Sequence, residues 1–270
     1  MSAPKVITSL TNDRVKAIRA LEMRKVRKET GLFVAEGASL LISARDHGFV
    51  PETLVYQAGT NESGIVRGLI VWALKEGAEV LEVSEAVLAK LASKDNPQTV
   101  LGVFKQAFAP PPQAKAIAPS ATWLALEEVR DPGNLGTIIR TSDAVGVAGV
   151  ILVGACCDPY SIESIRATMG SVFAVPLAKM EREAFVALAA GWPGDVVATH
   201  LDARDDFRAV SYRGPELVVM GSEGPGLSDA VAAACTRRVK IPMSGSLDSL
   251  NLAIATALTL YQIRGPHLKI

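Results

Sequence analysis

Apolar residues follow two alternating patterns along the first part of this sequence. Short runs of valine, isoleucine and leucine predict buried strands, and longer segments with apolar residues at helical spacing predict helices. A helix capped by Asn12 and running to about Lys28 comes first, and Gly31 ends it. Strands are then expected at residues 32–35, 53–56, 80–83 and 100–105, and helices at 38–46, 64–75 and 85–91. Strands and helices that alternate in this way predict a small α/β sandwich.

The pattern is interrupted in the middle of the chain. Residues 106–120 carry four prolines and little apolar periodicity, which is typical of an extended linker. We therefore expect a first domain at residues 1–106, a linker at 107–120 and a second domain at 121–270. A chain of 270 residues is long enough for two domains, each with its own core.

The second domain begins with a strand–helix–strand pattern. A strand at Trp123–Leu126 is followed by a helix that starts with Asn134 as its cap and ends near Gly146, and then by a strand at Gly149–Val153. This βαβ unit predicts a parallel sheet. Further helices are expected at 161–168 and 182–190, and further strands at 172–175, 196–200 and 217–220.

The last segment consists of a strand, Arg238–Pro242, a polar loop, Met243–Asp248, and an apolar helix, Ser249–Tyr261. The apolar residues of this helix do not form a single stripe, so we expect it to be buried on most sides.

Bulk composition excludes several classes of protein. Apolar residues make up 49% of the chain, and 28 basic residues balance 28 acidic ones, so net charge names no partner. Three cysteines and three scattered histidines, His47, His200 and His267, provide neither a disulfide framework nor a zinc site. No signal segment and no apolar run long enough to cross a bilayer is visible. We expect a soluble cytoplasmic protein that needs no metal.

Basic residues concentrate near the N-terminus. Residues 1–30 contain eight Lys and Arg against three acidic residues. Such a segment suits nucleic acid, although the outer face of a solvated helix has the same composition. The candidate RNA-binding residues are Arg14, Lys16, Arg24, Lys25, Arg27 and Lys28.

A first candidate motif is Asp131-Pro-Gly-Asn-Leu-Gly-Thr-Ile-Ile-Arg-Thr-Ser-Asp143. It lies between a strand and a helix, where open α/β sheets bind ligands. Within an apolar stretch of that helix, Arg140 needs an anion or a fork-shaped partner. The alternative is a structural ion pair with Asp131 or Asp143.

Two more candidate motifs follow later strands. The loop Gly221-Ser-Glu-Gly-Pro-Gly-Leu-Ser228 has glycines but no phosphate-binding lysine, and it carries Glu223. It suits a ligand of positive or mixed charge, or it is an ordinary turn with Ser228 as a helix cap. In the third motif, Ile241 to Leu252, Ser249 and Asn251 are placed to cap a helix or to meet a ligand.

Taken in order, DPGNLGTIIRTSDAVG, GSEGPGLS and IPMSGSLDSLNLAIA resemble the three signature motifs of the SpoU (TrmH-like) family of RNA 2′-O-ribose methyltransferases. The segment Ile165–Leu177 resembles the family's connecting segment. Asn12–Leu21 and Gly31–Gly37 resemble its L30e-like substrate-binding domain. One departure is Ser222, which stands where the family most often has Asn.

The resemblance implies a SPOUT-type α/β fold with a parallel sheet and a C-terminal trefoil knot, a homodimer, and S-adenosylmethionine (SAM) bound in the knot. Carried over by position, the cofactor-binding residues are Gly221, Glu223, Gly224, Ile241, Met243 and Leu250. The polar active-site residues are Asn134, Arg140, Glu223, Ser249 and Asn251.

The implied reaction is methylation of a ribose 2′-hydroxyl in RNA, with 23S ribosomal RNA favoured. Because an arginine stays protonated, we expect Arg140 to hold the phosphate beside the target ribose rather than to act as the base. The alternatives are a tRNA 2′-O-methyltransferase and a non-enzymatic RNA-binding protein that keeps the fold. The reversed order of glycines argues against a dinucleotide-dependent dehydrogenase.

Overall fold

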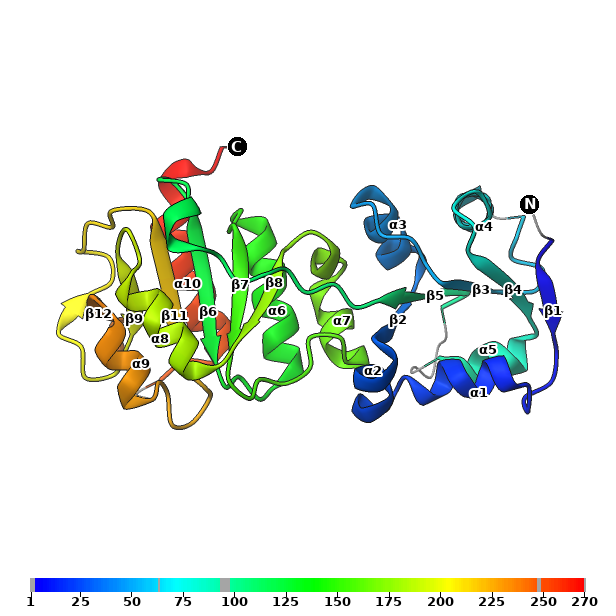
Figure 1. Cartoon of the computed structure of the whole chain (residues 1–270), viewed down its shortest axis with the longest axis horizontal. Coiled ribbons are helices and arrows are strands. Elements are labelled where there is room, and N and C mark those ends of the chain that lie inside the picture. The colour runs from blue at the N-terminus through cyan, green and yellow to red at the C-terminus, as the bar shows by residue number, and fades with distance from the viewer. Residues whose placement is uncertain (1–2, 63, 93–97, 247–248, 270) are drawn as a thin grey trace. The chain divides into compact units, whose positions relative to one another are not determined.

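The chain is seen here as a computed structural model, which describes residues 3–62, 64–92, 98–246 and 249–269 (Figure 1). It divides into two compact units. The first consists of the residues up to Ala107 together with Asp158–Ala174, and the second of Phe108–Cys157 together with the residues from Val175 onward. The segment Asp158–Ala174, which we expected inside the second domain, therefore belongs to the first unit. No helix in the described part of the chain combines the length and apolar character needed to cross a membrane.

The first unit is built on a mixed sheet with strand order β1-β4-β3-β5-β2, in which β1, β4 and β3 are parallel and β5 is antiparallel to its neighbours. Its strands are β1 (Lys5–Ile7), β2 (Leu32–Glu36), β3 (Thr53–Gln57), β4 (Glu79–Val83) and β5 (Val100–Lys105). The helices are α1 (Asp13–Ala20), α2 (Arg24–Thr30), α3 (Ala38–Asp46), α4 (Gly64–Lys75), α5 (Glu85–Leu91) and α7 (Ile162–Thr168). Helices α1 and α5 cover one face of the sheet, and α3 and α4 cover the other (Figure 1). The alternation of helices and strands after Gly31 matches the sequence pattern, whereas the short edge strand β1 was not predicted.

The single helix expected from Asn12 to Lys28 is wrong, because the chain forms two helices, α1 and α2. The Arg27 guanidinium lies under the break, where its Nη1 atom donates 2.8 Å hydrogen bonds to the carbonyl oxygens of Leu21 and Glu22. Its Nε atom donates to Asp158 at 2.8 Å. Arg27 is 4% exposed, so its assignment to an RNA-binding surface is corrected: this cation holds the fold of the first unit.

A cluster of aromatic side chains packs the segment Asp158–Ala174 against the rest of the first unit. The Phe33 ring lies 4.7 Å from that of Tyr160, and the Phe173 ring lies 5.0 Å from Phe49 and 5.3 Å from Phe104, between centroids. The strand predicted at residues 172–175 is wrong. Residues Ser171–Phe173 form a 3₁₀ turn that directs Phe173 into this cluster, and the strand forms afterwards, at Leu177–Met180.

The second unit contains a seven-stranded, fully parallel sheet, as the buried apolar runs predicted. Its order is β10-β12-β9-β11-β6-β7-β8. The strands are β6 (Thr122–Glu127), β7 (Gly149–Val153), β8 (Leu177–Met180), β9 (Val196–Thr199), β10 (Asp205–Asp206), β11 (Glu216–Met220) and β12 (Arg237–Lys240). The helices are α6 (Pro132–Ala144), α8 (Arg182–Ala190), α9 (Asp229–Ala234) and α10 (Leu252–Arg264). Helices α8 and α9 share one apolar core with the central strands, while α6 and α10 pack against each other.

Two helix ends differ from the expectation. Helix α6 is capped by Asp131, whose Oδ1 atom accepts from the Asn134 backbone N–H at 2.5 Å, so Asn134 is not the cap and its amide is available for other contacts. Helix α10 starts at Leu252 and is capped by Asn251. The predicted loop before it includes residues 247 and 248, which lie outside the described residues.

Helix α10 is also less buried than predicted. Ile254, Leu258 and Tyr261 are 51%, 42% and 50% exposed, and their spacing places them on one side of the helix. The opposite side carries the fully buried residues Thr256 and Leu260. The apolar residues therefore serve two surfaces, one packed inside the unit and one facing outward.

Candidate active site

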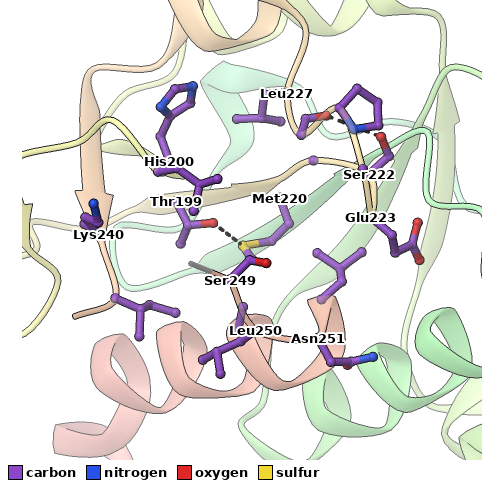
Figure 2. A pocket seen from close by; sticks show the side chains of 18 of the residues that line it. Thr199, His200, Met220, Ser222, Glu223, Leu227, Lys240, Ser249, Leu250 and Asn251 are labelled. Atoms are coloured by element: carbon purple, nitrogen blue, oxygen red, sulfur yellow. Dashed lines mark hydrogen bonds between the residues drawn. The ribbon is translucent and has the colours of Figure 1, made fainter. Parts of the chain in front are cut away.

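The second unit contains a cavity of about 630 Å³ at the carboxyl ends of its strands. This is the edge of a parallel sheet where ligands usually bind, and the volume is that of a small-molecule site. Three separate parts of the second unit form the walls. They are Thr199–Asp202 at the end of β9, Met220–Leu227 at the end of β11, and a C-terminal set made of Lys240, Ile241 and Met243 with Ser249–Leu252 and Ala255. Figure 2 shows side chains from all three segments around one space.

The loop after β11 depends on the glycine at its start. A Cβ atom on Gly221 would lie 2.2 Å from the Gly226 carbonyl carbon and 2.4 Å from the Leu227 nitrogen, closer than any real contact. This close approach allows Ser222 and Gly226 to exchange backbone hydrogen bonds of 3.1 and 3.2 Å. The loop is therefore a closed turn whose shape requires glycine at position 221.

A chain of hydrogen bonds joins the three sequence motifs. The Asn251 Nδ2 atom donates to Asn134 Oδ1 at 2.9 Å, and Asn134 Nδ2 donates to the Glu223 carboxylate at 3.1 Å. Asn251 Oδ1 meanwhile accepts from the backbone N–H groups that begin α10. Each amide is satisfied at both ends, so the network sets the position of α10 relative to the glycine loop.

Glu223 is held as a carboxylate. Burial acts to raise its pKa, but hydrogen bonds from the Asn134 amide and from the backbone N–H groups of Arg130 and Asp131 outweigh burial and lower the pKa below the usual glutamate value. The cavity wall thus carries a fixed negative charge, which suits a ligand that bears a positive charge.

The residues predicted to bind a cofactor come together at this cavity. Gly221, Glu223, Gly224, Ile241, Met243 and Leu250 all line it. Ser249 and Asn251, which we predicted as polar active-site residues, line it as well, and Asn134 contacts it through Glu223 and Asn251.

Arg140 does not line the cavity of its own chain. It is exposed on α6, and within the described residues it forms no hydrogen bond or ion pair with Asp131 or Asp143. The structural ion pair that was the alternative for Arg140 is therefore not formed. The Arg140 guanidinium is exposed to solvent and can bind an anionic ligand.

The N-terminal basic residues differ in their surroundings. Arg14 pairs with Glu79, Lys16 lies 3.0 Å from Asp13, and Lys25 lies 3.9 Å from Glu29. All three remain exposed, as do Arg24 and Lys28, in contrast to Arg27.

Sequence reasoning missed one wall of the cavity. The segment Thr199–Asp202 begins within the strand predicted at 196–200 and continues past its end. The Thr199 hydroxyl donates to Met220 Sδ at 3.3 Å, and both residues line the cavity (Figure 2). The signal that could have identified this segment is its position at the carboxyl end of a predicted parallel strand, because such ends lie together along one side of the sheet. Among the described residues, no group of three or more His, Cys, Asp and Glu side chains is arranged to hold a metal ion.

Comparison with known proteins gives a consistent result. Residues 121–261 match the SpoU rRNA Methylase family, and residues 12–102 match the MRM3-like substrate binding domain. The chain is 34% identical to an uncharacterized tRNA/rRNA methyltransferase of Synechocystis sp., over 96% of this chain and 93% of that protein. It is 28% identical to the Bacillus subtilis 23S rRNA (guanosine(2553)-2′-O)-methyltransferase RlmP, over 97% and 100% of the two chains.

A solved structure agrees along nearly the whole length. The AdoMet-bound rRNA methyltransferase of Sinorhizobium meliloti is 45% identical, with a TM-score of 0.90 over 98% of this chain and 99% of that one. Both the sequence matches and the shared fold thus extend over both units. The chain belongs to the SpoU rRNA methylase family.

Proposed function

We propose that this protein transfers the methyl group of SAM to a ribose 2′-hydroxyl of 23S ribosomal RNA. The observation that carries the proposal is the hydrogen-bonded chain Asn251–Asn134–Glu223, which joins the three family motifs at one cavity. The named activity of the B. subtilis relative and the bound AdoMet of the S. meliloti structure support the same reaction.

The residues around the cavity fit SAM. The cavity offers about 630 Å³, a loop closed around Gly221 that brings backbone groups to its wall, and the Glu223 carboxylate. Gly221, Ile241 and Leu250 would hold the cofactor mainly through backbone groups, with Glu223, Gly224 and Met243 shaping the site. When bound, SAM supplies an electrophilic sulfonium methyl group.

The chain's own residues must then orient the ribose and handle a proton. A ribose hydroxyl is a very weak acid, so its proton leaves as the new bond forms. Arg140 holds the phosphate beside the target ribose, and this phosphate accepts or relays the proton of the 2′-hydroxyl. The positive charge of Arg140 stabilises the developing oxyanion. Asn134 positions the ribose or Arg140, while Ser249 and Asn251 hold the loop that precedes α10.

Two features of the fold belong to this proposal. The C-terminal segment is threaded through a loop of the second unit as a trefoil knot, which would account for the meeting of distant parts of the chain at one cavity. The first unit is an L30e-like domain that binds RNA through Arg14, Lys16, Arg24, Lys25 and Lys28, as its match to a substrate-binding domain suggests. An experimental density map that traced the tail outside the loop would contradict the knot.

The protein acts as a homodimer in the cytoplasm, where ribosomal RNA is the target. The outward side of α10 supports the dimer, because Ile254, Leu258 and Tyr261 present an apolar surface that water would otherwise cover. Helix α6 packs on α10, so Arg140 is carried by a helix next to this surface.

Methyl transfer from labelled SAM to total RNA, followed by mapping of the modified ribose, tests the reaction and the substrate. Arg140→Ala should lower kcat by about 10²-fold or more while the Kd for SAM stays close to that of the wild type. Near-normal turnover of the variant would refute the role of Arg140. Label in tRNA alone would favour a tRNA methyltransferase, and SAM binding without transfer to any RNA would favour a non-enzymatic RNA-binding protein.

A further inference from the structure

A second carboxylate, that of Glu127, lies outside the cavity and binds the last residue of the glycine loop, residues 221–228. Glu127 is the last residue of β6 and is 2% exposed. Its Oε2 atom accepts from the Ser228 backbone N–H at 2.8 Å, and its Oε1 atom accepts from the Ser228 hydroxyl at 2.7 Å. Ser228 ends the glycine loop and caps α9.

The loop after β6 and the loop after β11 therefore each provide a carboxylate that accepts hydrogen bonds from the other loop. Glu127, at the start of the loop after β6, binds the far end of the loop after β11. Glu223, inside the loop after β11, binds the backbone N–H groups of Arg130 and Asp131 at the far end of the loop after β6. Each loop is bound by a carboxylate of the other, and the part of the cavity wall formed by residues 224–227 lies between Glu223 and Ser228, where the two contacts are made.

Arg182 binds two carboxylates of the loop after β6. The Arg182 Nε atom donates to Glu127 Oε1 at 2.7 Å, and a second nitrogen pairs with the Glu128 carboxylate. Glu128 has a φ of +51°, a left-handed conformation that residues with side chains rarely adopt. Without Arg182, the buried Glu127 carboxylate would lose the cation that compensates its charge, and Glu128 would lose the contact that holds it in this conformation.

We propose that Arg182 and Glu127 are positioning residues that set the shape of loop 221–228 and thereby the affinity of the cavity for SAM. Neither residue lines the cavity, and both act through Ser228 and the loop. The inference rests on the proposed function, because it takes SAM as the ligand.

The first test compares two arginine variants in the full-length protein. Arg182→Met should weaken SAM binding about tenfold by isothermal titration calorimetry, because an ordered loop becomes an ensemble of conformations. Arg237→Met is the matched control. Arg237 is 39% exposed against 36% for Arg182, and its Nε lies 3.0 Å from a carboxylate oxygen of Asp195. It is the first residue of β12, whereas the cavity lies at the carboxyl ends of the strands. Both variants should lower Tm, and only Arg182→Met should change the Kd.

Steady-state kinetics separates positioning from catalysis. In Arg182→Met the KM for SAM should rise with the Kd, while kcat stays within about threefold of the wild type. Arg182→Lys should restore part of the affinity, since an ammonium can pair with one of the two carboxylates but cannot bridge both. Glu127→Gln combined with Arg182→Met should weaken binding no more than the stronger single variant if the two residues act as one unit.

The result that overturns the proposal is an unchanged Kd for SAM in Arg182→Met with a loss of Tm equal to that of Arg237→Met. Should Glu127→Gln fail to fold, the comparison of Arg182→Met with Arg182→Lys still decides. Failure of the wild-type protein to bind SAM would instead refute the proposed function.

Discussion

At the scale of single residues, the site depends on a few positions where only one type of residue fits. Gly221 is the clearest case, because the backbone of Gly226 and Leu227 in the same loop occupies the space of a Cβ atom. Asn134 is another, since its amide both accepts from Asn251 and donates to Glu223. A substitution at either position changes the cavity without touching the core of the sheet.

Gly221→Ala should lower SAM affinity by at least about tenfold and destabilise the second unit by roughly 1–3 kcal/mol, because the methyl group forces the loop open. Calorimetry and thermal denaturation measure the two effects. Gly224→Ala is the control for stability, since no atom lies within 4 Å of its Cβ position. Equal Tm values for the two variants would contradict the close approach at Gly221.

The charge of Glu223 makes a prediction about pH. Its pKa in the folded protein is lowered, so the ionised side chain stabilises the network fully above the unfolded pKa of about 4.5 and loses this effect as pH falls through the folded pKa. The difference in Tm between wild type and Glu223→Gln should be constant from about pH 8 to about pH 5 and should shrink below about pH 4.5. A difference that shrinks near neutral pH would show that Glu223 is not held as a carboxylate.

At the scale of elements, the first unit is completed by a segment from later in the chain. Helix α2 is tied to Asp158 through Arg27, and the ring of Phe173 packs among the aromatic residues of the sheet and of the turn after α3. Residues up to 107 therefore do not include all of the core of this unit.

Arg27→Met should destabilise the first unit by about 3 kcal/mol, because it leaves the Asp158 carboxylate without its partner and frees the carbonyl groups at the α1–α2 break. Lys25→Met, which removes an exposed cation 3.9 Å from Glu29, should change stability by less than about 1 kcal/mol. Denaturation followed by circular dichroism compares the two. If Arg27→Met kept wild-type stability and lost RNA affinity, our correction of its role would be wrong.

At the scale of the whole molecule, helix α10 has two apolar sides, and among the described residues only one of these sides is covered. A second copy of the same helix would cover the other side through a twofold contact.

Leu258→Glu should convert a dimer into a monomer, because it places a charge at the centre of the outward apolar surface, and activity should fall with the loss of the dimer. Light scattering coupled to size-exclusion chromatography measures the mass. Val71→Glu, at a position on α4 that is 56% exposed, should leave the mass unchanged. A wild-type protein that is monomeric at micromolar concentration would contradict the assigned surface.

Local sequence patterns determined much of this protein. Apolar runs and helix signals predicted the parallel sheet of the second unit and most helices of the first, because periodicity and end signals act over a few residues. The resemblance of three short motifs to the SpoU family also identified eight residues of the cavity wall, because each motif is a continuous stretch that can be matched residue by residue.

Only the tertiary structure decided which distant residues meet. Arg27 looked like any other basic residue of its helix until Asp158, 131 positions away, was found beside it. Phe173 belongs to a turn and not to a strand because its ring packs against Phe49 and Phe104, which lie far earlier in the sequence. Arg182 and Glu127 carry no local motif, and their link to the glycine loop exists only once β6, α8 and α9 are assembled. Contacts of this range depend on the packing of whole elements, and no window of local sequence contains that information.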